Sequence, residues 1–305
     1  MFRAIIVLFL VTVAVCCNSQ DFIFTQNHPG ILYQNPGFAG IETDPTIRTT
    51  YQSNLAYSML YGSFDAYSYK LHGGLGVYVG QRWSNAVSGI FSSAGAIYSP
   101  SFRISDSTFF KPSLQYGISN YFSEYTGSPL PHSNYQDNYS WGSLGAGLSF
   151  IHKNSFAGIV LHNVNQPLPG NGYGKIPMDI IVSAGTLINI TKNTNASKKI
   201  LLMPSIFYGI QSDYWYYNAG AEYRKSAFLC GLRVINYSSD GMYYDKFVDY
   251  LCAELGLRFN RLRLVYSHDF SFNNSNDSQN EFTLCISFAR TNVKGKNSGL
   301  YNMLL

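Results

Sequence analysis

Histidines are the residues of this chain best suited to acid–base or metal chemistry, and there are six of them. His268 and Asp269 are the one adjacent His–acid pair, but consecutive side chains of a strand point to opposite faces, so the two cannot form a dyad directly. His152 and His162 lie at the ends of short predicted strands, and the spacing of the histidines does not match a zinc site. We therefore expect no catalytic residue, no metal and no cofactor.

The known catalytic motifs point the same way. The chain has neither the HExxH motif of zinc proteases nor the GxSxG motif of hydrolases. Residues 142–147 read Gly-Ser-Leu-Gly-Ala-Gly, which resembles a phosphate-binding loop only in composition, because the Lys-Ser/Thr pair is missing. The run also lies inside an alternating segment, so we interpret it as a strand and predict a non-enzymatic protein.

Alternation of apolar and polar residues is the main structural signal of the chain. In residues 144–151, for example, Leu144, Leu148 and Phe150 share one face and small residues share the other. About fourteen segments have this character and are predicted strands. They are residues 46–52, 57–65, 73–81, 87–102, 109–121, 144–151, 156–162, 179–190, 200–211, 215–223, 227–237, 250–259, 262–270 and 281–288.

The connectors between the later strands alternate in length. Residues 152–155, 224–226 and 259–261 are short connectors, whereas 163–178, 238–249 and 271–280 are long ones. A soluble antiparallel sheet with tight turns at one end gives this pattern. A transmembrane β-barrel gives it too, with short periplasmic turns and long outer loops.

Composition favours the barrel. Only 12% of residues are charged, against about 25% in soluble domains, and aromatic residues reach 16%, with 25 Tyr and 21 Phe. We predict an all-β fold: a transmembrane antiparallel β-barrel of the outer-membrane type with about 14 strands. The competing interpretation is an aromatic-rich secreted β protein with no membrane role.

Charge placement indicates which face points into the lumen. On the lipid face an Arg at the bilayer midplane costs about 2–4 kcal/mol, so the more polar face is assigned inward. It carries Glu222, Arg224, Arg233, Glu254, Arg258, Arg263 and Asp269.

The cysteines are predicted to be too far apart for a disulfide. Cys252 and Cys285 fall on the same inward face, but a strand lies between them. Two strand spacings, about 9–10 Å, exceed the roughly 7 Å between Cα atoms that a disulfide allows. Together with Cys230 they are predicted free thiols.

The chain divides into four predicted parts. Residues 1–19 have the positive start and short apolar run of a secretory signal peptide. Residues 20–45 form an N-terminal segment, either a plug or a strap; residues 46–288 form the barrel; and 289–305 form a C-terminal tail. The net charge of +4 is too small to indicate nucleic acid as a partner.

An even number of strands places both ends of the barrel in the periplasm if the N-terminus is there. The predicted periplasmic turns are then basic, and a basic rim attracts an acidic partner. The candidate periplasmic partner contacts are Lys192, Lys198, Lys199, Arg224 and Lys225. The alternative is that these lysines are the ordinary polar residues of any turn.

Several short motifs resemble the PorP/SprF family of Bacteroidetes. Residues 20–22 read Gln-Asp-Phe, 24–26 read Phe-Thr-Gln, and 35–40 read Asn-Pro-Gly-Phe-Ala-Gly, where the family usually has Ala in place of Gly37. Residues 162–167 read His-Asn-Val-Asn-Gln-Pro, and 266–269 read Tyr-Ser-His-Asp, with His268 and Asn280 as departures. The resemblance assigns family-typical structural roles to Asn35, Pro36, Gly40, Asn165, Gln166 and Pro167.

The resemblance implies an outer-membrane β-barrel subunit of the type IX secretion system, without catalytic residues, that supports export of surface proteins or gliding adhesins. It implies as partners other subunits of that system, both periplasmic and outer-membrane lipoproteins, together with the exported cargo and outer-membrane lipid. The alternative function is an outer-membrane transport channel for a small solute.

Overall fold

The computed structural model describes residues 24, 26, 31–42, 44–84, 88–125, 135–169, 174–191, 199–211, 214–241, 244–245, 248–272 and 278–288. The predicted signal peptide and C-terminal tail lie outside these residues. Among the described residues, no helix combines the length and hydropathy needed to cross a membrane.

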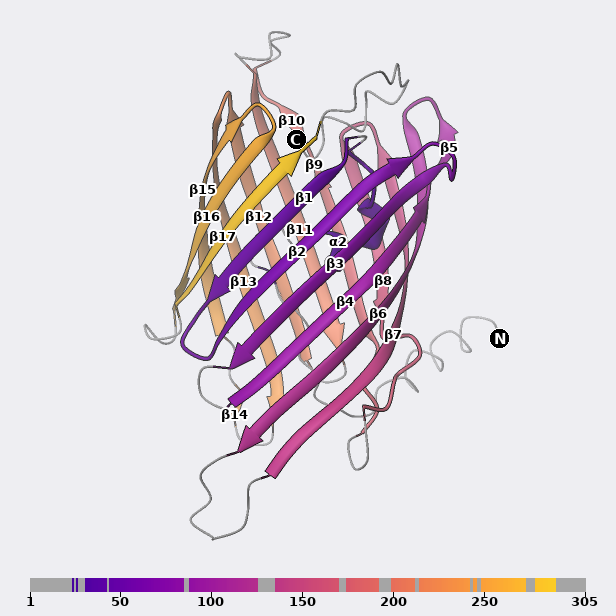
Figure 1. Ribbon diagram of the computed structural model, residues 1–305. Coiled ribbons are helices and arrows are strands. Elements are labelled where there is room, and N and C mark those ends of the chain that lie inside the picture. Colours follow the sequence, from indigo (N-terminus) through magenta and orange to yellow (C-terminus); the bar gives the residue numbers. More distant parts are fainter. Residues whose placement is uncertain are drawn as a thin grey trace, which may run out of the picture.

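Fourteen long strands form one antiparallel sheet that closes on itself (Figure 1). Closure joins the first and last strands, from the Thr46–Ser287 pair to the Ser53–Asn280 pair. The strands are β1 (Thr46–Ser53), β2 (Tyr57–Ser68), β3 (Gly73–Ser84), β4 (Ser88–Pro100), β6 (Thr108–Tyr125), β7 (Tyr135–His152), β8 (Ser155–His162), β9 (Asp179–Thr186), β11 (Ile200–Gln211), β12 (Tyr214–Lys225), β13 (Phe228–Gly241), β15 (Val248–Phe259), β16 (Leu262–Ser271) and β17 (Gln279–Ser287). The predicted fold class is confirmed.

Three short strands extend the edges of this wall: β5 (Phe102–Ser105), β10 (Ile188–Asn189) and β14 (Tyr244–Asp245). The predicted strand 87–102 is therefore interrupted, because β4 ends at Pro100 and β5 begins after Ser101. The predicted long connector 238–249 is mostly strand, since β13 continues to Gly241 and β15 begins at Val248.

The two ends of the barrel differ. We call the end that holds Thr46 and Ser287 the turn end, at the top of Figure 1, and the opposite end the loop end. Tight turns at the turn end place Lys153, Ser226 and Asn260 at positive φ (51°, 54° and 53°), as hairpin turns of two residues require. The loop end carries the long connector between β8 and β9. The predicted alternation of short and long connectors thus describes this part of the wall.

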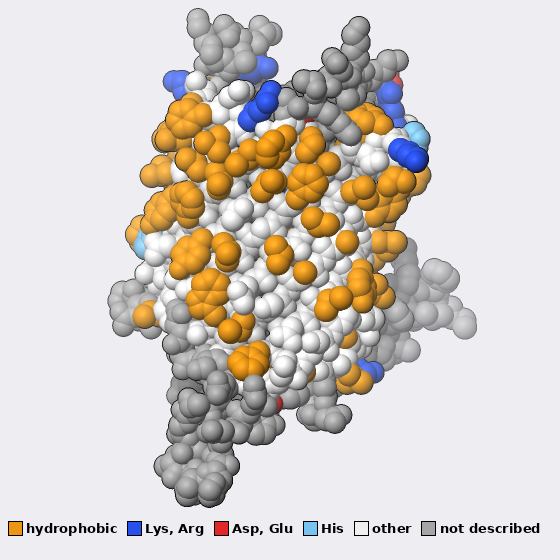
Figure 2. Space-filling view, in the orientation of Figure 1, with side chains coloured by type: hydrophobic (Ala, Val, Ile, Leu, Met, Phe, Trp, Pro, Cys, Tyr) orange, Lys and Arg blue, Asp and Glu red, His pale blue; other side chains and the backbone are white. Residues whose placement is uncertain are grey.

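The two faces of the wall have opposite chemistry. Exposed apolar side chains cover the outer face, whereas the Lys and Arg side chains that Figure 2 shows gather mainly along the rim at the turn end. Outward residues include Val79, Leu114, Ile118, Leu144, Leu148, Phe150, Leu255 and Phe282. Glu222, Arg224, Arg233, Glu254, Arg263 and Asp269 are buried inside, as alternation predicted. An apolar belt between polar rims is the surface that a bilayer requires.

A segment of the chain before β1 lies inside the closed sheet. It comprises residues 24, 26 and 31–42, and we call it the inner segment. It contains helix α2 (Ile31–Gln34) and the 3₁₀ helix η1 (Pro36–Phe38), and all seven helical residues are buried. Figure 1 shows α2 inside the barrel, enclosed by the strands of the wall. The chain passes directly from this segment into β1, so the inner segment is tethered at the turn end.

Candidate functional site: the inner segment and its cradle

Polar contacts tie the inner segment to distant parts of the wall. The Gln26 carboxamide donates to Ser267 Oγ in β16 at 2.9 Å and to the Glu281 carbonyl oxygen in β17 at 3.1 Å. Asn35 Nδ2 donates to Ser183 Oγ in β9 at 3.2 Å. Because β9 and β17 are well separated around the sheet, the inner segment crosses the lumen.

Apolar packing is concentrated on one side of the lumen. Phe24 packs against Tyr61 of β2 (ring centroids 4.9 Å apart), and Phe38 packs against Phe156 of β8 (5.0 Å). Tyr33 stacks on His162, with centroids 5.2 Å apart. The buried apolar cluster contains the inner segment and residues of β2, β3, β4, β7 and β8, together with Ile176 of the β8–β9 loop. This half of the lumen is therefore a conventional hydrophobic core.

Asn35 is the hub of the family motif at residues 35–40. Its side-chain oxygen accepts from the Gly37 N–H at 3.0 Å, which caps η1, and from Ser149 Oγ of β7 at 2.9 Å. Pro36 occupies the first turn of η1, where a missing N–H costs nothing. A Cβ on Gly158 of β8 would lie 2.4 Å from Asn35 Nδ2, so a glycine is needed beside it. The Asn-Pro pair thus both shapes the segment and attaches it to the wall.

Gly40 makes the turn that brings the segment to the wall. Its φ of +64° lies in the left-handed region that favours glycine. Its N–H donates to Asp65 Oδ2 of β2 at 2.8 Å. Nearby, buried Lys111 Nζ of β6 donates to the Ala39 carbonyl oxygen at 3.1 Å and to Ser101 Oγ at 2.9 Å. Two adjacent residues of the inner segment are therefore held by charged groups of the wall.

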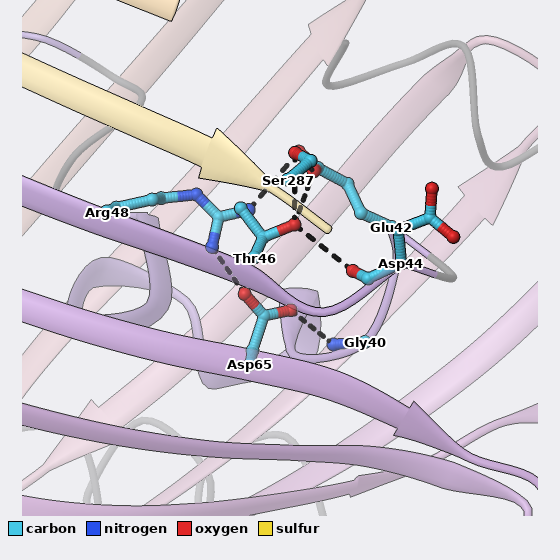
Figure 3. Close-up of polar contacts among 7 residues, drawn as sticks. All are labelled: Gly40, Glu42, Asp44, Thr46, Arg48, Asp65 and Ser287. Atoms are coloured by element: carbon cyan, nitrogen blue, oxygen red, sulfur yellow. Dashed lines mark hydrogen bonds and ion pairs between the residues drawn. The ribbon is translucent and has the colours of Figure 1, made fainter. Parts of the chain in front are cut away.

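An ion-pair network continues from this turn (Figure 3). Arg48 of β1 lies between Asp65, with which it is paired, and Glu42, whose Oε1 is 3.2 Å from Nη2. Thr46 Oγ1 and Ser287 Oγ donate to Glu42 Oε2 at 2.8 and 3.2 Å. The pKa of Glu42 lies below its usual range. Burial alone would raise this pKa. Arg48, Arg263 and the hydrogen bonds from the two hydroxyl groups together lower the pKa by more than burial raises it. The network joins the inner segment to both strands of the closure seam.

The opposite half of the lumen is polar. Arg233 of β13 donates to Asn218 Oδ1 at 2.6 Å and to Ser205 Oγ at 3.3 Å, and Arg224 pairs with Glu222. A Cβ on Gly220 would lie 2.2 Å from the Leu232 carbonyl oxygen and 2.8 Å from the Arg233 Cγ, so a glycine is needed where β12 passes the backbone and the start of the Arg233 side chain. Such buried groups must be paired or hydrated, because an isolated buried charge is costly.

The family motif at residues 162–167 attaches the β8–β9 loop to the wall at the loop end. Asn165 Nδ2 donates to the Gly142 carbonyl oxygen at 2.8 Å, and Asn165 Oδ1 accepts from the Leu144 N–H at 2.9 Å. Gln166 has a positive φ of 41°, and the Pro167 carbonyl oxygen accepts from the Ile176 N–H at 2.9 Å. This motif therefore folds the β8–β9 loop against β7.

The candidate partner contacts have different positions. Lys225 is exposed and Lys199 half-buried at the turn end, whereas Lys192 and Lys198 lie outside the described residues. Arg224 is buried, and its guanidinium binds Glu222. We therefore withdraw Arg224 from the set of candidate contacts. Lys153 and Arg261, which the sequence also places in predicted periplasmic turns, are exposed at the same end. Lys70 and Arg103 are exposed there as well, and the sequence did not predict them as part of the basic rim.

The residues suited to chemistry are dispersed. His268 lies on the outer face 2.9 Å from Asn280 Oδ1, while Asp269 is buried inside, so alternation separates them as expected. No group of three or more His, Cys, Asp or Glu is placed to hold a metal among the residues described. The three cysteines within the described residues, Cys230, Cys252 and Cys285, are free, and the last two are buried.

Comparison with known families identifies the chain. A family model described as "Type IX secretion system membrane protein PorP/SprF" matches residues 17–288. The chain belongs to the PorP/SprF family. The predicted family is thus confirmed, and the protein is a membrane protein of the type IX secretion system. No curated protein matches the PorP/SprF chain in sequence.

A solved outer-membrane protein shares the fold of this PorP/SprF protein. The outer membrane protein Omp33 of Acinetobacter baumannii is 10% identical, with a TM-score of 0.51 over 82% of this chain and 100% of Omp33. CdiB from Acinetobacter baumannii is 10% identical, with a TM-score of 0.49 over 80% of this chain, which spans 60% of CdiB. The barrel, its apolar belt and the family together place the protein in the outer membrane.

Proposed function

We propose that this barrel is a non-enzymatic subunit that supports export of surface proteins or gliding adhesins, with the turn end in the periplasm. The family supports a role in type IX secretion. The observation that carries the export role over a solute channel is the inner segment, which crosses the lumen and is bonded to walls on both sides. We interpret it as a plug.

The exposed basic residues of the turn end support docking of other secretion subunits there. Lys153, Lys225 and Arg261 are exposed at or beside three tight turns, between β7 and β8, β12 and β13, and β15 and β16. A periplasmic protein or outer-membrane lipoprotein with an acidic surface fits this rim electrostatically. Such contacts between exposed charges weaken with salt, because the Debye length is only about 8 Å at physiological ionic strength.

Deletion of the gene tests the export role. The proposal predicts that a defined set of surface proteins disappears from the cell surface and returns with the wild-type gene. An intact surface proteome combined with failed uptake of one solute would favour the channel instead.

Charge reversal tests the docking surface. The variant Lys153→Glu/Lys225→Glu/Arg261→Glu is compared with Lys175→Glu, which makes the same kind of change at the loop end. Reversal at the turn end should reduce co-purification of secretion subunits several-fold relative to the wild type. This difference between variant and wild type should shrink at high salt, because salt also weakens the wild-type contacts. Equal co-purification by both variants would remove the docking surface from the proposal.

A further inference from the structure

Strand β7 extends beyond its neighbour β8 at the loop end. β6 pairs with all 18 residues of β7, but β8 pairs only with residues 146–152. In the part of the chain that the structure describes, no strand pairs with residues 135–145 on the side of β7 that faces β8. Figure 1 shows β6 and β7 projecting past the other strands at the bottom.

The backbone groups along this edge can be assigned from their neighbours. In an antiparallel strand, residues alternate between the two adjacent strands in the direction of their N–H and C=O groups. Leu144 bonds toward the β8 side: its carbonyl oxygen accepts from the Val164 N–H at 2.8 Å, and its N–H donates to Asn165. The backbone N–H and C=O groups of the residues with the same parity as Leu144 therefore also face the β8 side. These residues are Gly142, Ser140, Asn138 and Gln136.

The chain itself begins to fill this edge and then leaves it. The Asn165 carboxamide bonds to Gly142 and Leu144 as the peptide group of a strand would. Pro167 follows two residues later and has no N–H to donate, so strand pairing cannot continue through it. The edge beyond Gly142 is thus competent for strand pairing, and no described residue of this loop, within 163–169 and 174–178, pairs with it.

The two faces of the edge indicate what could bind there. Asn138 and Ser140 are exposed on the outer face and accept from Asn120 Nδ2 at 2.9 Å, which makes that face polar. On the inner face Tyr139 lies against Trp141, with ring centroids 5.7 Å apart, and Asp137 continues the row. A matching segment alternates polar residues with apolar ones, and a Lys or Arg opposite Asp137 complements its charge.

Exposed sheet edges are usually blocked by Lys, by Pro or by a bulge, because they pair with other chains. None of the four edge-facing positions, Gln136, Asn138, Ser140 and Gly142, carries Lys or Pro. We propose that this edge of β7 binds an extended, basic segment of an exported surface protein by strand addition. The inference rests on the proposed function and names a cargo contact at the outer mouth of the barrel.

A peptide-binding measurement tests the edge directly. The probe is a fluorescein-labelled synthetic peptide, Lys-Thr-Val-Thr-Val-Thr-Lys, added to the purified full-length protein in detergent; its Lys and Val side chains share one face and its Thr side chains the other. Asn138→Pro/Ser140→Pro removes two N–H donors that face the edge and none that faces β6, and Pro is tolerated at such positions of edge strands. Asn138→Ala/Ser140→Ala is the matched control, because it removes the same side chains and keeps both N–H groups.

The Pro variant should bind the peptide at least about tenfold more weakly than the wild type, as loss of two hydrogen bonds implies. The Ala variant should bind within about threefold of the wild type, since side-chain loss spares the edge. Retention of the heat-modifiable gel shift by both variants establishes that the barrel is folded.

Equal peptide affinity in all three proteins would overturn the inference. Concentration-dependent dimers that the Pro substitutions abolish would also overturn it, by assigning the edge to a second copy of the chain. The export role is tested separately by the surface proteome of the deletion strain. If the peptide binds only to proteins with the intact edge, but the deletion strain exports its surface proteins normally, the strand-addition site is supported and its assignment to exported cargo is wrong.

Discussion

The backbone of Gly74 in β3 lies directly against the carbonyl oxygen of Ala39 in the inner segment. A Cβ built on Gly74 would stand 1.9 Å from that oxygen and 2.7 Å from the Gly40 nitrogen. Two backbone segments in such contact leave no space for a side chain, so this glycine fixes how deeply the inner segment sits in the lumen.

Gly74→Ala should therefore loosen the inner segment more than it weakens the wall. The expected result is faster protease cleavage within residues 31–42 of the folded barrel. Gly62→Ala of β2 is the control, because its Cβ would meet nothing closer than 3.9 Å. Identical cleavage of both variants would show that the inner segment does not depend on this contact.

Gly37 and Ser149 are expected to be energetically coupled. A Cβ on Gly37 would lie 2.2 Å from Ser149 Oγ, so Gly37→Ala should destabilise the protein by about 1–3 kcal/mol, the usual cost of overpacking. Adding Ser149→Gly removes the obstructing hydroxyl and should recover part of that loss. The double-mutant cycle is measured by urea unfolding in detergent. Strictly additive effects would contradict the contact.

Glu42 should make stability depend on pH. Its pKa in the folded protein is below its usual range, with burial opposed by Arg48 and Arg263. Its stabilising effect is therefore complete above the unfolded pKa of about 4.3 and is lost as the pH falls through the lower folded pKa. The melting temperature of Glu42→Gln should fall below that of the wild type at pH 7 and approach it near pH 3. A gap that widens in acid would refute this assignment.

The three thiols should differ in reactivity. Cys252 and Cys285 are buried in the lumen, whereas Cys230 is only half-buried and shares its strand parity with the exposed Phe228 and Leu232. A membrane-permeant maleimide should label Cys230 in the folded barrel and the other two only after unfolding. Mass spectrometry of the labelled peptides reads the result. Rapid labelling of Cys252 in the folded protein would mean that the lumen is accessible.

Alternation was sufficient to predict the wall, because lipid outside and packed polar groups inside force a period of two. Alternation also predicts that Arg224 points into the lumen, because it shares the parity of the buried Glu222. Arg224 could therefore have been left out of the partner contacts from the sequence alone. The ion pair of Arg48 with Asp65 could have been found in the same way, since both occupy inward positions of predicted strands.

The inner segment could not be predicted from periodicity. Its helices contain only four and three residues, too few for a repeating pattern, and its place depends on contacts with residues far away in sequence, such as Ser183. The extension of β7 to Tyr135 was also missed, because the residues that share the parity of the lipid-facing Leu144 are polar or small instead of apolar: Gln136, Asn138, Ser140 and Gly142.

Conductance across a planar lipid bilayer tests most directly whether the inner segment fills the lumen of an export subunit. The wild-type barrel is compared with a variant in which residues 31–41 are replaced by a Gly/Ser linker of equal length. The account predicts no steady ion current from the wild type and clear channel openings from the linker variant. Equal steady currents from both proteins would contradict it and favour a solute channel.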